Sequence, residues 1–584
     1  MIKFIKLLGK RRQLSFCLGL AVAFFFCADW FLRVNPFPSE TLDQLEASPE
    51  LTDRNGRSLS RRLNAQQQWR IPVDLGDFSP WLKKATIAVE DERFYRHPGV
   101  DPLSIGRASL QNLLAGGVVS GASTLDMQLC RMLDPRPRTF AVKISEVARA
   151  WQADNFLSKD EILEAYLNLA PYGGNLQGGQ AAALRYFGKP VTELSLSEAA
   201  LLAGIPQSPA RLRPDRRPEA SRQRRNKVLN RMFVENMISR ERYLDAILQP
   251  LGLEETNLTA ASAHHFVAAA LSRRPSGGQT FLDPDLQADL RRMAAARMDE
   301  LPSASDLGIV VIEIETGGVL AMLGGLHFGQ SPSGQVNAVT AWRSPGSTLK
   351  PFVYATAALE RRLNGDTILT DAPFAFSGWT PGNFDRTFSG EVKAGDALRR
   401  SLNMPALQVC QAVGAAKVAG IAEGCGVRFR EDPVGKGGLA FVLGGVETNL
   451  LDLTNAYATI GRQGIRRNIR FFQDDAISEA AILDPLVCSW LGEELSSWRL
   501  PSTHFESISS FSTPWFVRKT GTSSGRRDAW AVGHNGRYAV GVWAGRPSGM
   551  GDQAFVGAHV AEPLLAEIFN LAKIRRTDSP CEHE

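Results

Sequence analysis

The apolar residues in the first half of the chain recur at helical spacing. The repeat is clearest within residues 81–89 and 162–167, where apolar side chains return every three or four positions. Such a repeat puts the apolar side chains on one helix face, which is buried against other helices. A short strand pair is predicted ahead of them at 51–60, turning at Asn55-Gly56. We therefore predict a mainly α-helical domain that extends to about residue 247.

The second half of the chain follows a different pattern. Residues 308–325 predict a strand, a turn and a second strand, and an apolar helix is predicted at 350–361. Later strand candidates lie at 515–522, 528–533 and 538–545. This order predicts an α/β domain in which helices pack on an antiparallel sheet. A Pro/Gly/Ser cluster at 275–278 separates the two halves, so the fold is expected to be multidomain.

The N-terminus has the pattern of a membrane anchor. Lysines and arginines between positions 3 and 12 precede an uncharged run at 14–28. Because basic residues stay on the cytoplasmic side, we expect one transmembrane helix, with the remaining chain on the extracytoplasmic (periplasmic) side of the cytoplasmic (inner) membrane. The run is short for a span, and a cleavable signal peptide is the alternative. The absence of an A-x-A site favours an uncleaved anchor.

Composition and charge narrow the function classes. The 584 residues are 44% hydrophobic and 22% charged, which is typical of globular domains. The formal net charge of +5 does not require nucleic acid, and we predict no nucleic-acid partner. The seven cysteines show no metal-ligand spacing, so no metal site is predicted from them. A Cys410–Cys425 disulfide fits the spacing, but free thiols are favoured.

Three short motifs in the second half predict a serine nucleophile. Ser347 and Lys350 stand three positions apart at the start of an apolar helix, so the hydroxyl and the amine share a face. A lysine activates a serine only when burial or a second cation lowers the lysine pKa, and Lys519 supplies that cation. Ser401 and Asn403 can relay a proton and hold a substrate amide. In the alternative, Ser347 is a helix cap and Lys350 is solvated.

The motifs S-x-x-K, S-x-N and K-T-G, in this order, resemble those of the penicillin-recognising acyltransferases over residues 305–566. The resemblance implies that Ser347 attacks the penultimate D-Ala carbonyl of a peptide stem, with Lys350 as base. It also implies that Lys519, Thr520 and Thr522 bind the terminal carboxylate. Gly521 leaves room for the substrate backbone, and the amides of Ser347 and Thr522 would stabilise an oxyanion.

Two separated acids stand out in the helical half. Glu90 ends an apolar helical run, and Glu146 follows Lys143 on a second helical segment. Sugar transfer with inversion needs a base to deprotonate the incoming hydroxyl and positive groups to stabilise a departing pyrophosphate. The two acids and their basic neighbours meet that need. On chemistry alone, however, a solvated charged face is the favoured alternative.

Longer sequence motifs around these acids favour the catalytic interpretation over a solvated charged face. They are E-D-x-x-F-x-x-H-x-G at 90–99, G-A-S-T-L with a following Gln at 121–128, K-I-S-E at 143–146, K-D-E-I-L-E-A-Y-L-N at 159–168 and R-R-N-K-V-L at 224–229. In this order they resemble the five motifs of family 51 glycosyltransferases. The resemblance implies a lysozyme-like, mainly α-helical fold with an apolar segment, here 103–119, that dips into the membrane.

The same resemblance implies roles for individual residues. Glu90 would activate the 4-hydroxyl of lipid II, and Glu146, Lys143 and Arg131 would lie at the pyrophosphate of the growing strand. The other implied substrate-binding positions are Asp91, Phe94, His97, Ser123, Thr124 and Gln128. Packing is an equal alternative for His97.

Some positions depart from the family pattern. Asp126-Met127 replaces a small or β-branched residue followed by Gln, and Val142 replaces an Arg. Met127 and the P-Y-G-G run at 171–174 look like the penicillin-binding protein 1C subgroup. Glu164 and Asn168 share a helix face, so a structural role is expected for them as readily as a catalytic one.

Together the resemblances imply a class A, bifunctional penicillin-binding protein, a bacterial peptidoglycan synthase. The predicted domains are 1–34 (cytoplasmic tail and transmembrane anchor), 35–75 (linker), 76–250 (glycosyltransferase), 251–300 (interdomain linker), 301–572 (transpeptidase) and 573–584 (tail). Expected partners are lipid II, nascent glycan strands, peptide stems, β-lactam antibiotics, the membrane and other cell-wall synthesis proteins. Transpeptidation is expected to need no cofactor, whereas the glycosyltransferase site has room for a divalent cation.

Two alternatives stay open at this point. A carboxypeptidase or β-lactamase would use water in place of the acceptor amine to release the acyl group. A non-enzymatic scaffold or penicillin sensor would keep the motifs as remnants. The intact acids, serine and lysines disfavour the scaffold, and the glycosyltransferase motifs favour transpeptidation.

Overall fold

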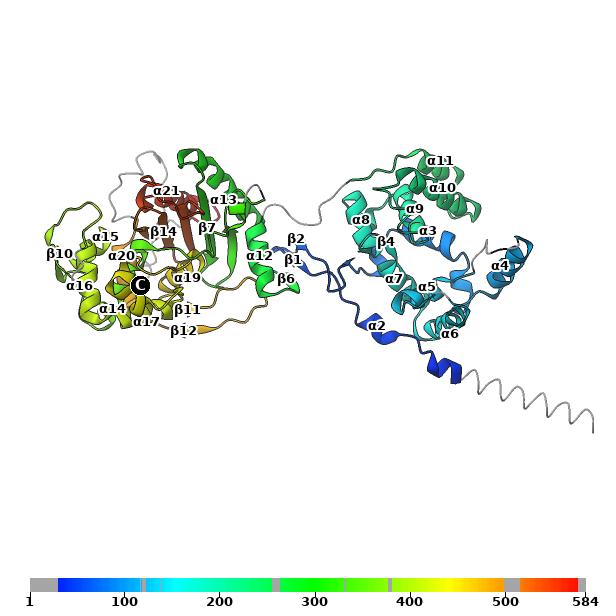
Figure 1. The fold of residues 1–584 in the computed structure, drawn as a ribbon, viewed down its shortest axis with the longest axis horizontal. Helices are drawn as coiled ribbons and strands as arrows, with labels where there is room; N and C mark the ends of the chain where they lie inside the picture. The colour runs from blue at the N-terminus through cyan, green and yellow to red at the C-terminus, as the bar shows by residue number, and fades with distance from the viewer. Residues whose placement is uncertain are drawn as a thin grey trace, which may run out of the picture. The chain divides into compact units, whose positions relative to one another are not determined.

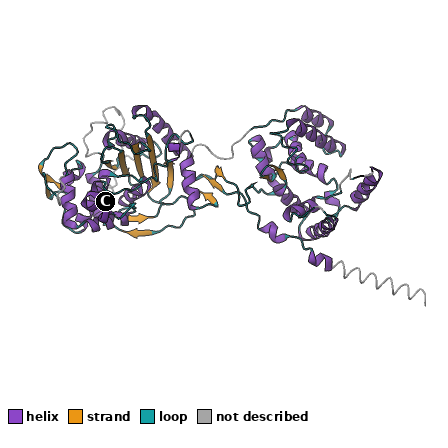
Figure 2. Cartoon of the chain, viewed as in Figure 1, coloured by secondary structure: helices purple, strands orange, loops and turns teal. Residues whose placement is uncertain are grey.

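The computed structural model describes residues 30–115, 117, 122–137, 139–254, 263–329, 332–375, 381–497 and 515–575. The chain divides into two compact units. Unit 1 comprises Met1–Pro49 and Arg61–Thr259, and unit 2 comprises Glu50–Ser60 and Ala260–Glu584. Figures 1 and 2 show that unit 1 is mostly helix and that unit 2 is built around a sheet.

Unit 1 is a helical assembly with one small sheet, β3-β5-β4. Its helices are α2 (Ser39–Asp43), α3 (Pro80–Glu90), α4 (Pro102–Ala115), α5 (Leu125–Leu133), α6 (Phe140–Phe156), α7 (Lys159–Leu169), α8 (Gly179–Phe187), α9 (Leu196–Gly204), α10 (Pro218–Val234) and α11 (Arg240–Leu248). Its strands are β3 (Trp69–Arg70), β4 (Pro171–Gly173) and β5 (Leu176–Gln177). The predicted helical domain is confirmed.

Side-chain caps fix where the functional helices of unit 1 begin. Ser79 caps α3 ahead of Pro80, and Thr124 caps α5 by accepting a hydrogen bond from the Met127 amide. In α7, Glu164 accepts a hydrogen bond from the Leu75 amide, and Asn168 bonds both backbone groups of Val73. Glu164 and Asn168 therefore tie down the segment before α3, which is a structural role.

The membrane anchor predicted at 14–28 lies outside the described residues. Within the ranges that are described, no helix combines the length and the apolar character needed to cross a bilayer.

Unit 2 is organised by a five-stranded antiparallel sheet in the order β13-β14-β15-β7-β8. The strands are β7 (Asp306–Glu313), β8 (Val319–Leu323), β13 (Val517–Thr522), β14 (Asp528–His534) and β15 (Tyr538–Gly545). They agree with the strands predicted from the sequence. Helices α13 (Pro284–Arg297) and α21 (Gly557–Asn570) pack on one face with Leu307, Ile309 and Val311, while α19 (Leu450–Gly461) packs on the other with Val310 and Ile312 (Figure 1).

Further elements complete unit 2 around this sheet. The helices are α12 (His264–Arg273), α14 (Lys350–Leu359), α15 (Ala394–Arg399), α16 (Asn403–Val413), α17 (Ala415–Cys425), α18 (Pro433–Gly437) and α20 (Pro485–Glu494), with a 3₁₀ turn η6 (Gly346–Leu349) before α14. The strands are β1 (Glu50–Thr52), β2 (Ser58–Arg61), β6 (Gly277–Gln279), β9 (Ile368–Asp371), β10 (Gly390–Lys393), β11 (Ile465–Arg467) and β12 (Glu479–Ala481).

Segments expected to be linkers contribute to unit 2. The strand pair at 51–60 turns at Asn55-Gly56 as predicted, and β1 pairs in parallel with β6. Helix α12 buries Phe266 in the main core of the unit. The Pro/Gly/Ser cluster at 275–278 therefore lies inside unit 2, because Gly277 packs directly against the Glu50 carbonyl. Cys130, Cys410, Cys425 and Cys488 are buried free thiols, so the Cys410–Cys425 disulfide is absent.

Candidate active sites

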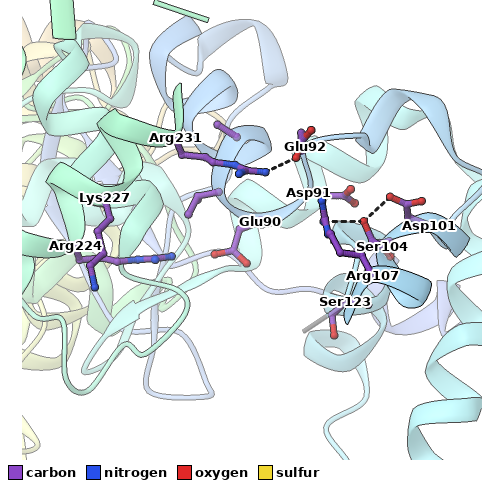
Figure 3. Close-up of a pocket in the computed structure, with 14 residues that line it drawn as sticks. Glu90, Asp91, Glu92, Asp101, Ser104, Arg107, Ser123, Arg224, Lys227 and Arg231 are labelled. Carbon is purple, nitrogen blue, oxygen red and sulfur yellow. Dashed lines mark hydrogen bonds and ion pairs between the residues drawn. The ribbon is translucent and has the colours of Figure 1, made fainter. Parts of the chain in front are cut away.

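The carboxylate of Glu90 lies at a charged cavity of about 280 Å³ in unit 1. Figure 3 shows basic side chains of α10 on one side of Glu90, and Ser104 and Arg107 of α4 on the other. The α10 residues in the cavity wall are Arg224, Lys227 and Arg231. Asp91, Glu92 and Asp101 also line the cavity, so Glu90 lies in a mixed acidic and basic wall whose basic groups can bind phosphate.

Burial and the neighbouring charges shift the pKa of Glu90 in opposite directions. Burial raises the pKa of Glu90, while the hydrogen bond from Gln128, 2.9 Å from Oε2, and the charges of Arg224 and Arg131 lower it. Burial is the largest of these effects, so the net pKa lies above that of an ordinary glutamate. Gln128 thus contacts the reactive acid directly.

A second polar group connects the cavity wall to α6. The Lys143 amine donates to Ser123 Oγ and to Glu146 Oε2, each at 2.8 Å. Ser123 itself lines the cavity. The structure therefore brings Ser123, Lys143 and Glu146 together, with the lysine partly exposed. Val142 precedes this lysine on α6 and places no charge there.

Four predicted substrate-binding residues are buried in the scaffold instead. His97 Nε2 lies 3.0 Å from both oxygens of Asp91, and Asp91 accepts a hydrogen bond from the Leu125 amide. Phe94 is fully buried, and Thr124 donates to the Gly99 carbonyl at 2.7 Å. Asp91 and Thr124 reach the edge of the cavity, whereas Phe94 and His97 do not line it.

Asp126 forms a buried ion pair behind this region. Its Oδ1 lies 3.1 Å from the Lys159 amine, which also pairs with Asp154. Burial raises the pKa of Asp126 to about 6. Ligand atoms of Asp91, His97 and Asp126 lie within 4.8 Å of one another, the spacing of a metal site. Asp126 is already paired with the Lys159 amine and Asp91 with His97, so the carboxylates have partners within the protein.

In unit 2, Ser347 lies in η6 immediately before α14. The turn fits tightly against β13, because a Cβ on Gly346 would lie 2.6 Å from the Thr522 carbonyl, and one on Gly521 would lie 2.3 Å from the Pro345 carbonyl. Gly346 has a positive φ of 56°, which favours glycine. The two glycines therefore let the half-buried Ser347 approach the end of β13.

The amine of Lys350 is fully buried and points at the S-x-N motif. It donates to the Ser401 carbonyl at 2.5 Å and to Asn403 Oδ1 at 2.7 Å, with Ser401 Oγ at 3.4 Å. Burial and the charge of Lys519 hold the pKa of Lys350 well below its usual range. A lowered pKa makes the neutral form of this lysine, which can act as a base, more available.

Ser401 joins the two lysines. The amine of Lys519 donates to Ser401 Oγ at 2.8 Å, and burial lowers the pKa of Lys519 to about 7. Ser401 adopts φ 58°, a conformation that non-glycine residues rarely take and that is often found at active sites. The bend turns both the hydroxyl and the carbonyl of Ser401 toward Lys350.

Strand β13, which carries the K-T-G motif, lies at the edge of the sheet next to Ser401 and the two lysines. β13 pairs with β14 on one edge, and on its other edge Val517 forms a bridge with Ser496, so among the described residues only the 519–522 part of that edge has no strand partner. Thr520 is half-buried, and the Thr522 hydroxyl accepts a hydrogen bond from the Gly557 amide of α21. A sheet edge next to a serine offers an extended peptide backbone a place to pair.

The sequence analysis did not single out Asn383, which contacts Asn403 directly. Asn383 precedes Asn403 by twenty positions in an exposed loop segment, and no local pattern marks it. Only the fold brings it to the site.

The fold and the sites define a two-domain enzyme, with acids at a basic cavity in one unit and a serine acyltransferase with paired lysines in the other. The family described as Transglycosylase matches residues 55–233, and that of the penicillin binding protein transpeptidase domain matches 307–482. The chain belongs to the family of bifunctional penicillin-binding proteins.

Individual relatives support this assignment. The chain is 38% identical to penicillin-binding protein 1C of Escherichia coli (strain K12), covering 96% of this chain and 73% of the relative. It is 30% identical to penicillin-binding protein 1F of Bacillus subtilis (strain 168), covering 86% and 74%. A crystal structure of penicillin-binding protein 1A from Haemophilus influenzae has the same fold, with a TM-score of 0.58 at 18% identity over 92% of this chain and 94% of that one.

The family fixes the overall activity. The chain is a peptidoglycan synthase that polymerises lipid II into glycan strands and cross-links peptide stems, and it binds β-lactams through the transpeptidase domain. The transpeptidase reaction needs no cofactor.

Proposed function

We propose that Ser347 is the acylated nucleophile and Lys350 its base. The supporting observation is the convergence of Lys350, Ser401 and Lys519, because a buried amine held by Ser401 and Asn403 is ready to accept the serine proton. Ser347 attacks the penultimate D-Ala carbonyl of a stem, D-Ala leaves, and an amine of a neighbouring stem resolves the acyl-enzyme. This assignment makes the domain a D,D-transpeptidase.

Substrate binding in this domain is assigned to the K-T-G strand. Lys519 and Thr520 bind the terminal carboxylate of the stem, and the outer edge of β13 at 519–522 pairs with its backbone. Gly521 leaves room for η6 to pack against β13, and the amides of Ser347 and Thr522 stabilise the oxyanion. The close packing of η6 on β13 brings the two amide-bearing segments together.

In the glycosyltransferase domain, Glu90 is proposed to deprotonate the 4-hydroxyl of the incoming lipid II. Its elevated pKa makes it a stronger base than an exposed glutamate. Lys143, held by Ser123 and Glu146, and the basic wall of α10 bind the pyrophosphates. Gln128 orients Glu90, while Asp91, Phe94, His97 and Thr124 shape the cavity from behind.

We place the enzyme at the cytoplasmic membrane with both domains on the periplasmic side, as the basic N-terminus predicts. Apolar side chains exposed on α4 and α6 support a position of the glycosyltransferase domain at the lipid surface. They include Leu103, Leu110, Leu113 and Leu114 of α4 and Phe140, Ile144 and Trp151 of α6. A lipid surface would cover these side chains and deliver lipid II to the cavity.

The test separates the two activities in one purified protein. Glu90→Gln is expected to abolish lipid II polymerisation and leave labelling by a fluorescent penicillin unchanged, whereas Ser347→Ala should do the reverse. The matched controls are Glu193→Gln and Ser478→Ala, which change exposed residues in the respective domains. Polymerisation by Glu90→Gln or labelling of Ser347→Ala would overturn the respective assignment.

A further inference from the structure

A loop between β9 and β10 reaches the transpeptidase site from outside the three motifs. It begins at Asp371, which is fully buried although the rest of β9 is largely exposed. The two oxygens of Asp371 accept hydrogen bonds from Asn383 Nδ2 at 2.8 and 3.0 Å and from the Ser389 amide at 2.9 Å. A buried carboxylate with several N–H donors is a fixed anchor for the loop.

Asn383 uses its whole side-chain amide in this arrangement. Its Nδ2 donates to Asp371 and to the Thr387 carbonyl, each at 2.8 Å. Its Oδ1 accepts a hydrogen bond from the backbone N–H of Asn403 at 2.8 Å. Asn403 is the first residue of α16, and helices leave such N–H groups without an internal partner. Asn383 therefore caps the helix on which the S-x-N motif ends.

The loop also sets the orientation of the Asn403 side chain. Asn403 Nδ2 donates to the Gly382 carbonyl at 2.6 Å, which leaves Oδ1 to accept from the Lys350 amine at 2.7 Å. A flipped amide would place two N–H groups against the amine and would lose both bonds. Residues 382 and 383 thus hold Asn403 by both its backbone and its side chain.

We propose that Asn383, anchored by Asp371, is a positioning residue of the transpeptidase site that fixes Asn403 and, through it, the amine of Lys350. This inference rests on the proposed role of Ser347 and Lys350. The chain of hydrogen bonds from Asp371 through Asn383 and Asn403 to Lys350 carries it, since each link lies between 2.7 and 3.0 Å.

Asp371 also acts on Lys350 through its charge. It raises the pKa of Lys350 and opposes the lowering by burial and by Lys519 of β13. The other titratable groups around this region are Tyr354 of α14, which lies near Asp371, and Glu562 of α21, whose charge reaches Lys519. Removing the charge of Asp371 should therefore leave Lys350 unprotonated at lower pH.

The experiment measures the second-order rate constant for acylation by a fluorescent penicillin as a function of pH. Asn383→Ala should lower this constant about 10-fold or more, because it removes buried hydrogen bonds. Asp371→Asn should move the acidic limb of the pH profile to lower pH. The control Asp366→Asn makes the same chemical change just before β9, at an exposed carboxylate paired with Lys393, and should leave the profile unchanged.

An exchange of the pair separates positioning from folding. Asn383→Asp alone places two carboxylates side by side and should slow acylation. Adding Asp371→Asn restores one donor and one carboxylate, although not the bond to the Thr387 carbonyl, and should recover part of the rate. Wild-type rates and pH profiles in Asn383→Ala and Asp371→Asn would overturn the proposal, as would a double variant no faster than Asn383→Asp. Labelling of Ser347→Ala would instead overturn the proposed nucleophile, which is a separate result.

Discussion

The two sites of this chain use burial on groups of opposite charge. Burial raises the pKa of Glu90 in the glycosyltransferase domain and lowers the pKa of Lys350 in the transpeptidase domain. In both cases the neutral form is favoured, but the chemical result differs. The carboxylate becomes a stronger base that is present in a smaller fraction, while the amine becomes a weaker base that is present in a larger fraction.

The partners of the two bases differ in the same way. Around Glu90 the basic groups line an open cavity, where a pyrophosphate can reach them. Around Lys350 the second cation, Lys519, is itself buried and is bridged to Lys350 by Ser401. The first site therefore leaves its basic groups open to a charged substrate, whereas the second holds two amines around one hydroxyl.

The largest effect is expected from Lys350→Arg. A guanidinium keeps its proton at any pH the enzyme tolerates, so the variant retains positive charge but has no base. Penicillin acylation should fall by roughly 10²- to 10⁴-fold. Acylation of Lys350→Arg within about 3-fold of wild type would show that the neutral amine is not needed.

A smaller effect is expected when Gln128→Ala removes the hydrogen bond to Glu90. This bond lowers the pKa of Glu90, so its loss should raise that pKa and move the acidic limb of the polymerisation profile to higher pH by about one unit. The rate near neutral pH should drop up to about 10-fold. The control is Gln223→Ala, an exposed glutamine of α10; an unmoved limb in Gln128→Ala would contradict the account.

The fold was predictable where the pattern of apolar residues is local. The sheet strands and helices such as α14 follow from alternation or helical spacing within a few residues. The sequence did not predict that residues 264–279 belong to unit 2, because the pairing of Gly277 with Glu50 joins residues far apart in the chain. A Pro/Gly/Ser cluster indicates an irregular segment, but it does not say on which side of a domain boundary that segment lies.

The site residues also fall into those that a local motif predicts and those that only the fold reveals. Lys350, Ser401, Asn403 and Lys519 belong to motifs, and the structure brings them together. Asp126 was noticed as a departure, but its partner Lys159 could be found only in the structure. Asn383 has no motif at all, since an asparagine in a loop is common and its contact with α16 depends on the fold.

A modest effect is expected from Lys519→Arg. The pKa of Lys519 is about 7, so its positive charge is nearly complete about one pH unit below that value and is lost as pH rises through it. Acylation efficiency of the wild type should therefore decline above pH 7. In Lys519→Arg that decline should disappear, with a loss of roughly 3- to 10-fold at pH 6.5, where both side chains carry charge. The same decline in both proteins would assign it to another group.

A separate effect concerns the stability of the helical domain and not a reaction rate. Asp126 has a pKa of about 6 in the folded chain, against an ordinary value of 3.8. Its contribution to the free energy of unfolding is therefore fully present below pH 4 and is lost as pH rises through 6. Asp126→Asn should reduce this loss, by about 1 to 3 kcal/mol between pH 4 and 7.5. This loss of stability is measured by thermal unfolding at both pH values. The proteins compared are wild type, Asp126→Asn and the exposed control Asp77→Asn. Equal pH dependence in all three proteins would contradict the prediction.

The central claim is that two independent sites in one chain build and then cross-link glycan, and mixing the two inactive variants tests it most directly. With lipid II alone, Glu90→Gln should give no polymer, and Ser347→Ala should give polymer without cross-links. A mixture of the two proteins should yield cross-linked glycan, because the Ser347 of one variant acts on strands made by the other. Cross-links from Ser347→Ala alone, or polymer from Glu90→Gln alone, would contradict the account.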